Sequence, residues 1–420
     1  MRQALQKYAA CYRDDLENSV IPFWLKHSLD RQCGGYFNCL DRDGSVYDTK
    51  KYMWLQGREA FMFARLYNEF NRRGEFLDAS KLGIDFIRKH GKDGHGRVYF
   101  SLTREGQPYF FQRKPFGSVF YMLALIEYFR ATGDRSCLDE AVATFWKIRD
   151  WISDPSLLDR PSLPGQLRVS NLAHVMVLAG MVIELSRVHD DARYPAVMQE
   201  AVDQVKLHYH RKLRILMENV ALDGANISEH PEGRIFNPGH SIEVAWFLLL
   251  LLRRLKEMTG ADNAPARKLS LDVLEGSLEY GWDREYGGLL YFMDIEGRPT
   301  LQLESSMKLW WPHTEALYAL VLACCETGDP RWLPWLKKVH DYSYRHFVDP
   351  EYGEWFGYCD RQGRVALTCK GGNYKCCFHV PRSLLMSIQE IARLESGLDS
   401  PSQEPGAASA RTLITLPEVR

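Results

Sequence analysis

The sequence predicts an all-α fold in which six helix pairs close into an (α/α)6 barrel, with short β-hairpins in the connections. The prediction rests on a helix-opening segment that recurs six times, on apolar residues at helical spacing behind it, and on glycine-rich turns between the helices. Four copies carry a histidine, and these are His174, His240, His313 and His379, at steps of 66, 73 and 66 residues. Two earlier copies, around Arg58 and Ser118, continue the series at intervals of roughly 60 residues.

A repeat of this length is one supersecondary unit that cannot bury its apolar face alone. In order, the repeated segments occupy residues 54–60, 114–118, 171–174, 238–243, 311–316 and 378–382. Neighbouring units must therefore lie side by side. If six of them close into a ring, all six segments point at one cavity, and the scattered histidines become a candidate active site.

The long stretches behind these segments are predicted to be helices. Residues 120–130 and 316–325 place apolar side chains at intervals of three and four, which is the helical period. Both stretches end on the same local sequence, Ala-Thr-Gly133-Asp and Glu-Thr-Gly328-Asp. Glycine commonly ends a helix because it adopts the left-handed conformation without strain, so we expect both helices to stop there.

Four short segments between the helices predict β-hairpins. Each has an aromatic strand, a turn that ends in glycine, and a second polar strand, which is hairpin chemistry. The turns end at Gly44, Gly106, Gly297 and Gly363. The unbroken repeat indicates a single catalytic domain over residues 1–398. Residues 399–420 contain a run of Ser, Pro, Gln, Glu, Gly and Ala at 400–410, a composition typical of a disordered tail.

Charge and hydropathy exclude two classes of partner. The formal net charge is -1, and no basic stripe is present to neutralise a phosphate backbone, so we expect no nucleic acid. The longest apolar stretch, residues 244–252, ends at Arg253 and is too short to span a bilayer. The first residues lack the apolar core of a signal peptide. These features favour a cytoplasmic protein without a membrane segment.

The ten cysteines favour free thiols in a reducing compartment. They include the adjacent pairs Cys324-Cys325 and Cys376-Cys377, and no Cys-x-x-Cys zinc spacing occurs. We therefore expect neither disulfides nor a structural zinc site.

The most specific motifs resemble those of one enzyme family. They are Trp54-x-Gln-x-Arg58-Glu-Ala, Gly239-His240-x-x-Glu243, Trp311-x-His-x-Glu315-Ala and Phe378-His379-x-Pro-Arg382. Found in this order at the repeat spacing, they resemble the N-acylglucosamine 2-epimerases, animal-type members in particular. The resemblance covers about residues 5–395. It implies an (α/α)6 barrel that inverts C2 of a reducing sugar, with N-acetylglucosamine and N-acetylmannosamine as substrates, and with no redox cofactor or metal.

The resemblance also implies roles and partners. The matching positions give His240, His379, Arg58 and Glu243 as catalytic residues, and His174, Glu315, His313 and Trp311 as substrate-binding residues. Animal members are activated by ATP or other nucleotides, form homodimers and associate with renin. The chain has no P-loop. Its glycine-rich loop at residues 91–97 could cradle a phosphate, but it is more simply a turn.

The chemistry explains these residue types. Inversion at C2 requires an open sugar ring, removal of the C2 proton and return of a proton to the opposite face. Two histidines on opposite walls, His240 and His379, could each serve as base in one direction and acid in the other. Arg58 would stabilise the negative charge that develops on O1. Glu243, one helical turn after His240, would fix a histidine tautomer or relay the proton of ring opening.

Four alternatives remain open from the sequence. A related cellobiose or mannose 2-epimerase, or an aldose–ketose isomerase, would use the same barrel. A glycoside hydrolase would use Glu243 and Glu315 as its carboxylate pair. A metal-dependent isomerase would bind its ion through His174, His240 and Glu243. A protein that only binds a partner would not need the histidine pair.

Overall fold

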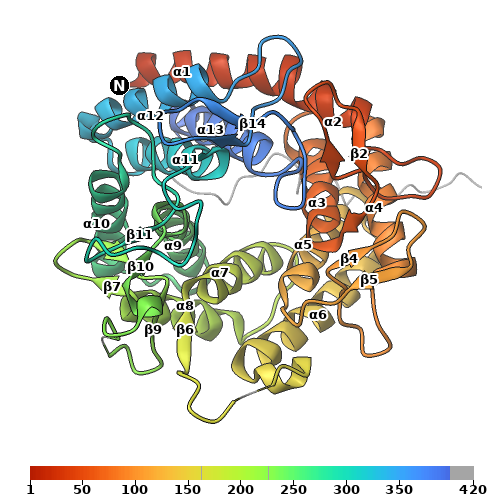
Figure 1. The fold of residues 1–420 in the computed structure, drawn as a ribbon, viewed down its shortest axis with the longest axis horizontal. Helices are drawn as coiled ribbons and strands as arrows, with labels where there is room; N and C mark the ends of the chain where they lie inside the picture. Colours follow the sequence, from red (N-terminus) through yellow and green to blue (C-terminus); the bar gives the residue numbers. More distant parts are fainter. Residues whose placement is uncertain (162, 226, 398–420) are drawn as a thin grey trace, which may run out of the picture.

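The computed structural model describes residues 1–161, 163–225 and 227–397. Within them, six inner helices and six outer helical segments form two concentric rings (Figure 1). The inner ring contains α3 (Met53–Glu69), α5 (Phe116–Thr132), α7 (Leu172–Ser186), α9 (Pro238–Thr259), α11 (Trp310–Thr327) and α13 (His379–Ser396). Each inner helix contacts the next, and α13 contacts α3, so the ring is closed. The predicted (α/α)6 barrel is confirmed. The predicted tail at residues 399–420 lies outside the described residues.

The outer ring has one helix against each inner helix. Its members are α4 (Gly74–His90), α6 (Arg135–Ser153), α8 (Tyr194–Leu207), α10 (Ala264–Gly281), α12 (Leu333–His346) and the N-terminal helix. That helix runs from α1 (Arg2–Asp15) through a π-helical turn (Leu16–Val20) into α2 (Ile21–His27), and α1 packs on α13. Shorter 3-10 turns are Pro155–Leu158, Pro231–Arg234 and Pro330–Trp332.

The distribution of apolar residues separates the two rings. Every residue of α11 from Trp310 to Cys324 is buried, because an inner helix is covered on all sides. In α12 the buried positions are Leu336, Val339, Tyr342 and Ser343, one face at helical spacing. The predicted glycine stops are also confirmed, since Gly133 and Gly328 follow α5 and α11 with φ of 73° and 67°.

Short antiparallel strand pairs connect the helices at one end of the barrel. The strands are β1 (Cys39–Leu40), β2 (Val46–Asp48), β3 (Lys51–Tyr52), β4 (Ser101–Leu102), β5 (Pro108–Phe110), β6 (Val169–Asn171), β7 (Tyr209–His210), β8 (Ile215–Leu216), β9 (Asn219–Ala221), β10 (Ile235–Phe236), β11 (Met293–Asp294), β12 (Lys308–Leu309), β13 (Tyr358–Cys359) and β14 (Val365–Leu367). Three predicted hairpins are confirmed as β1–β2, β4–β5 and β13–β14. The predicted hairpin at Gly297 is wrong. The strand before that turn, β11, pairs with β10 of the preceding repeat and not with a strand after the turn.

A buried lysine, an aspartate and an arginine form the same ionic contact in three of the connections. In each, the aspartate accepts from a lysine of its own connection at 2.9 Å and from an arginine of the neighbouring hairpin at 2.8–3.1 Å. The sets are Lys51–Asp30–Arg104, Lys308–Asp283–Arg361 and Lys370–Asp349–Arg42. The third joins the last repeat to the first and so closes the ring.

Two further predictions are tested by the structure. All ten cysteines are free thiols. Over the described residues, no helix combines the length and the hydropathy that crossing a bilayer requires.

Candidate active site

A cavity of about 500 Å3 opens where the inner helices begin. Its walls include the first turns of four inner helices, and the connections at residues 291–309 and 367–374 form its rim. The predicted site residues that line it are Arg58, His240, Glu243, Trp311 and His379. The ring thus brings together residues that lie up to 321 positions apart in the sequence.

His379 is held as a neutral base. Its Nδ1 lies 2.7 Å from Glu315 Oε1, and because a carboxylate only accepts, Nδ1 carries the proton. Its Nε2 is then the basic nitrogen, and Arg58 Nη1 donates to it at 3.3 Å. Burial lowers the pKa of His379 well below its ordinary value, and the positive charges of Arg58 and Arg382 lower it further. At neutral pH this imidazole can accept a proton.

His240 has the opposite electrostatic environment. Asn237 caps α9 by accepting from the His240 backbone N–H at 3.0 Å, which fixes the histidine in the first turn. The His240 Nδ1 lies 2.9 Å and 3.1 Å from the two oxygens of Glu218. Burial by itself lowers the pKa of His240, but the charge and hydrogen bond of Glu218 outweigh it, so the pKa is raised. This imidazole can hold a proton for donation through Nε2.

The two histidines share one neighbour. The ring of Trp311 is 5.0 Å from the ring of His240 and 5.8 Å from that of His379, measured between centroids. The two imidazoles therefore lie at most 10.8 Å apart, the sum of these distances. Separations within this upper limit include those at which one carbon lies about 3 Å from each Nε2.

Arg58 is a cation that forms no ion pair with a carboxylate of the described residues. Its guanidinium lies over the rings of Trp54, Phe120 and Phe378 at 4.2–4.7 Å, and its Nε makes no hydrogen bond within the described part of the chain. Burial is the main cause that lowers the pKa of Arg58 to about 10, so it stays charged at neutral pH. A cation kept in this state suits an anionic or strongly polar ligand.

Within the described residues Glu243 makes no hydrogen bond to a histidine, so it does not fix a histidine tautomer, which was one of its two predicted roles. Its Oε1 accepts from Arg382 Nη2 at 2.6 Å, and the same nitrogen donates to Glu315 Oε1 at 2.7 Å. The carboxylates that contact the histidines are Glu218 and Glu315. Residue spacing indicated the wrong partner because Glu243 and His240 share a helix, whereas Glu218 lies just before β9.

These contacts weigh against two alternatives. The predicted metal ligands His174, His240 and Glu243 do not come together. In the described chain, the group whose ligand atoms all lie within 4.8 Å is Glu243, Glu315 and His379, and there Arg382 already supplies the positive charge. A hydrolase acid–base pair also needs one protonated carboxylic acid. Glu243 and Glu315 are both paired with Arg382, so neither fits that role.

Two predicted substrate-binding histidines lie outside the cavity. His313 is fully buried, its Nδ1 donates to the Leu309 carbonyl at 2.7 Å, and its Nε2 accepts from the Leu289 N–H at 2.9 Å. It fixes the start of α11, so the structure contradicts its predicted contact with substrate. His174 packs against the Phe116 ring at 5.8 Å and does not line the cavity. Burial is the main cause that lowers its pKa to about 4.

The glycine-rich loop at residues 91–97 is a turn, as its simpler interpretation predicted. Asp93 accepts from the backbone of His95 and of Arg97 at 2.9 Å and 2.8 Å, and from the Arg97 guanidinium at 2.7 Å. The loop therefore satisfies its own donors with an acidic side chain and does not present a basic cradle.

Sequence reasoning missed the residues that orient the site. Glu218 accepts from His240 Nδ1, and Arg382 donates to Glu243 and Glu315. Trp246 Nε1 donates to Glu315 Oε2 at 3.0 Å. Arg382 belongs to the motif Phe378-His379-x-Pro-Arg382, and its place three residues after His379 indicates that the two side chains share a helix face. No local pattern pointed to Glu218.

Comparison with known proteins agrees with this geometry. Solved structures of the same architecture include a cellobiose 2-epimerase from Bacillus thermoamylovorans (TM-score 0.79, 20% identity, 91% of this chain and 99% of that one) and a D-mannose isomerase (TM-score 0.75, 17% identity, 93% and 98%). The chain thus shares the (α/α)6-barrel fold of these two solved structures.

The family follows from the sequence matches. A model of the N-acylglucosamine 2-epimerase (GlcNAc 2-epimerase) family matches residues 35–381. The chain is 42% identical to N-acylglucosamine 2-epimerase of Bos taurus over 90% of both chains, and 39% identical to that of Mus musculus over 95% of both. The chain belongs to the N-acylglucosamine 2-epimerase family, a family of isomerases.

Proposed function

We propose that this enzyme interconverts N-acetylglucosamine and N-acetylmannosamine by proton transfer at C2. The observation that carries the proposal is the unequal pair of histidines beside Trp311. One is held neutral between Glu315 and Arg58, and the other is held protonated by Glu218. A base and an acid at the two sides of one carbon are what inversion of that carbon requires.

The forward reaction starts from the open-chain sugar. His379 Nε2 removes the C2 proton, and the electron pair of the C–H bond moves into C1–C2 as the C1 carbonyl becomes an enolate oxygen. Arg58 donates to that oxygen and stabilises its charge. His240 Nε2–H then returns a proton to the opposite face of C2, and the carbonyl re-forms. In the reverse direction the two histidines exchange roles.

The electrostatic partners explain why the pair can act at neutral pH. Glu315 stabilises the His379 imidazolium once it forms, just as Glu218 stabilises the charge already present on His240. Arg382 forms ion pairs with both Glu243 and Glu315. Of these two carboxylates, Glu315 orients the His379 imidazole through its Nδ1.

Four further proposals rest on the resemblance to animal members of the family. They are activation by ATP or another nucleotide, a homodimeric state, association with renin, and a cytoplasmic location. Activity measured with and without ATP, and the molar mass from light scattering, test the first two. We also propose that neither a redox cofactor nor a metal takes part, which activity in the presence of a chelator would support.

Proton NMR of N-acetylmannosamine with the enzyme in D2O tests the function. We expect deuterium at C2 of the N-acetylglucosamine that forms, with no loss of rate in chelator. His240→Asn and His379→Asn should each abolish turnover, while His230→Asn, on an exposed side chain (47%), serves as a matched control. Exchange with cellobiose or mannose but not with N-acetyl sugars would show that the enzyme is one of the related epimerases.

A further inference from the structure

A second cavity continues the barrel axis below the catalytic residues. It measures about 60 Å3, several times the space that one water molecule needs. Three residues line both cavities, namely Arg58, Met176 and Glu243, so the two cavities adjoin at these side chains.

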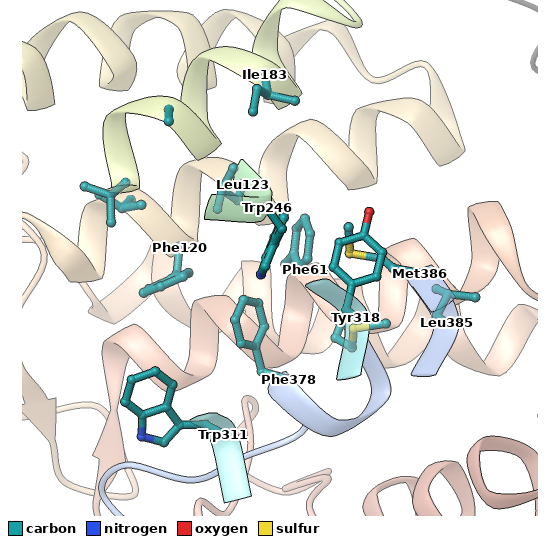
Figure 2. Packing of buried hydrophobic residues seen from close by; sticks show 14 of the residues in the cluster. Phe61, Phe120, Leu123, Ile183, Trp246, Trp311, Tyr318, Phe378, Leu385 and Met386 are labelled. Carbon is teal, nitrogen blue, oxygen red and sulfur yellow. The ribbon is translucent and has the colours of Figure 1, made fainter. Parts of the chain in front are cut away.

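The walls of this lower cavity are mostly apolar. Figure 2 shows Phe61, Phe120, Leu123, Trp246 and Phe378 gathered together, with Trp311 and Ile183 toward opposite ends of the group. Val177 and Gly180 of α7 also line the cavity.

The far end of the lower cavity is closed by charges. Arg65 donates to Glu184 at 2.8 Å and to Glu69 at 2.9 Å, and Arg65 and Glu184 are the lining residues there. The cavity is therefore a short apolar pocket with a polar base, rather than a channel through the barrel.

The position of the reacting carbon places a substituent at the entrance of this pocket. C2 must lie between His240 and His379, and the nitrogen of a 2-acylamino sugar is bonded to C2. Glu243 lies at the same boundary. Its Oε1 is taken by Arg382, and no hydrogen bond to its Oε2 occurs among the described residues. That oxygen can accept from the amide N–H of the substrate.

We propose that the lower cavity is the N-acyl subsite, with the acyl methyl group between Phe120, Leu123 and Val177 and the amide N–H on Glu243. This inference rests on the proposed function. The sugar hydroxyls stay in the upper cavity, which offers the polar groups of Tyr291, Glu304 and Asn373. Because the pocket is longer than a methyl group, it also accepts a propanoyl or butanoyl chain.

A series of N-acylmannosamines tests the proposal on the unmodified enzyme. Burial of one methylene lowers KM by about four-fold when kcat is unchanged. We expect KM to fall by about this factor from acetyl to propanoyl, and to rise again once the chain exceeds the pocket. A KM that does not depend on chain length would overturn the assignment.

Two variants test which cavity holds the acyl chain of the substrate. Val177→Phe fills the lower cavity and should remove the gain for propanoyl, raising KM for all N-acyl substrates by ten-fold or more. Leu367 lines the upper cavity and not the lower one. Leu367→Phe therefore adds the same ring to the upper cavity and should leave the dependence of KM on acyl-chain length unchanged. The opposite pattern would place the acyl group in the upper cavity and refute the proposal.

Two more results keep the outcomes separate. If Val177→Phe does not fold, Leu123→Ala, which widens the pocket, should move the optimum to a chain at least one methylene longer. Turnover of cellobiose without turnover of any N-acylmannosamine would refute the proposed function and the subsite together. Turnover of N-acetylmannosamine with no effect of chain length or of either variant would refute only the subsite.

Discussion

Glu59, next to Arg58 in the sequence, makes the stability of the enzyme depend on pH. The carboxyl group is fully buried, and neither oxygen makes a hydrogen bond within the described chain. Burial raises the pKa of Glu59 from 4.5 to about 8. The folded state therefore holds this proton at pH values where the unfolded chain releases it.

The sign and size of the effect follow from these two pKa values. Below pH 4.5 the carboxyl is protonated in both states, and the folded state suffers no penalty from it. As the pH rises toward 8, the free energy of unfolding falls by about 1.36 kcal/mol per pH unit, to a limit of about 5 kcal/mol. Glu59→Gln removes the titrating group and keeps the shape, at a cost that does not depend on pH.

Urea unfolding followed by circular dichroism at several pH values measures this difference. Between pH 5 and pH 8, the stability of Glu59→Gln relative to the unmodified enzyme should rise by about 3–4 kcal/mol. Taking the difference cancels the other titrating groups, which both proteins share. A difference that stays constant within about 1 kcal/mol over this range would refute the reasoning.

Three more predictions concern the site and the connections. Glu218→Gln removes the charge that raises the pKa of His240, so the alkaline limit of kcat in the direction that uses His240 as acid should move to lower pH; an unchanged profile would contradict this. Arg58→Met should lower kcat by roughly 10²–10³-fold with the circular dichroism spectrum unchanged. Asp283→Asn leaves the charge of Lys308 buried without its partner and should lower the free energy of unfolding by about 3–5 kcal/mol in urea, whereas Lys308→Met with Asp283→Asn should recover part of it.

Local signals made the fold predictable. Gly133 and Gly328 end their helices through their own backbone conformation, and the repeated segments open theirs, so both could be identified without tertiary information. The ring then brought His240, His379 and Arg58 together as expected. These predictions hold because each depends on residues close in sequence or on the spacing of the repeat.

Contacts between distant segments could not be predicted in the same way. Glu218 reaches His240 only through the placement of β9, and Asp30 meets Arg104 across 74 positions. His313 occupies the same repeat position as His240 and His379, yet both of its nitrogens are hydrogen-bonded, one to the Leu309 carbonyl and the other to the Leu289 N–H. A repeat predicts where a side chain begins, but neighbouring backbone groups decide which way it turns.

The junction between the last repeat and the first has a consequence for how the enzyme gains activity. Asp349 binds Arg42 across it, and Trp24 Nε1 donates to Glu354 at 2.6 Å. The pair of Arg58 and His379 lies across the same junction. The proposed mechanism therefore requires that the two ends of the chain have met before turnover can start. Recovery of turnover during refolding therefore reports the final closure of the ring, whereas helical content reports the earlier assembly of its parts.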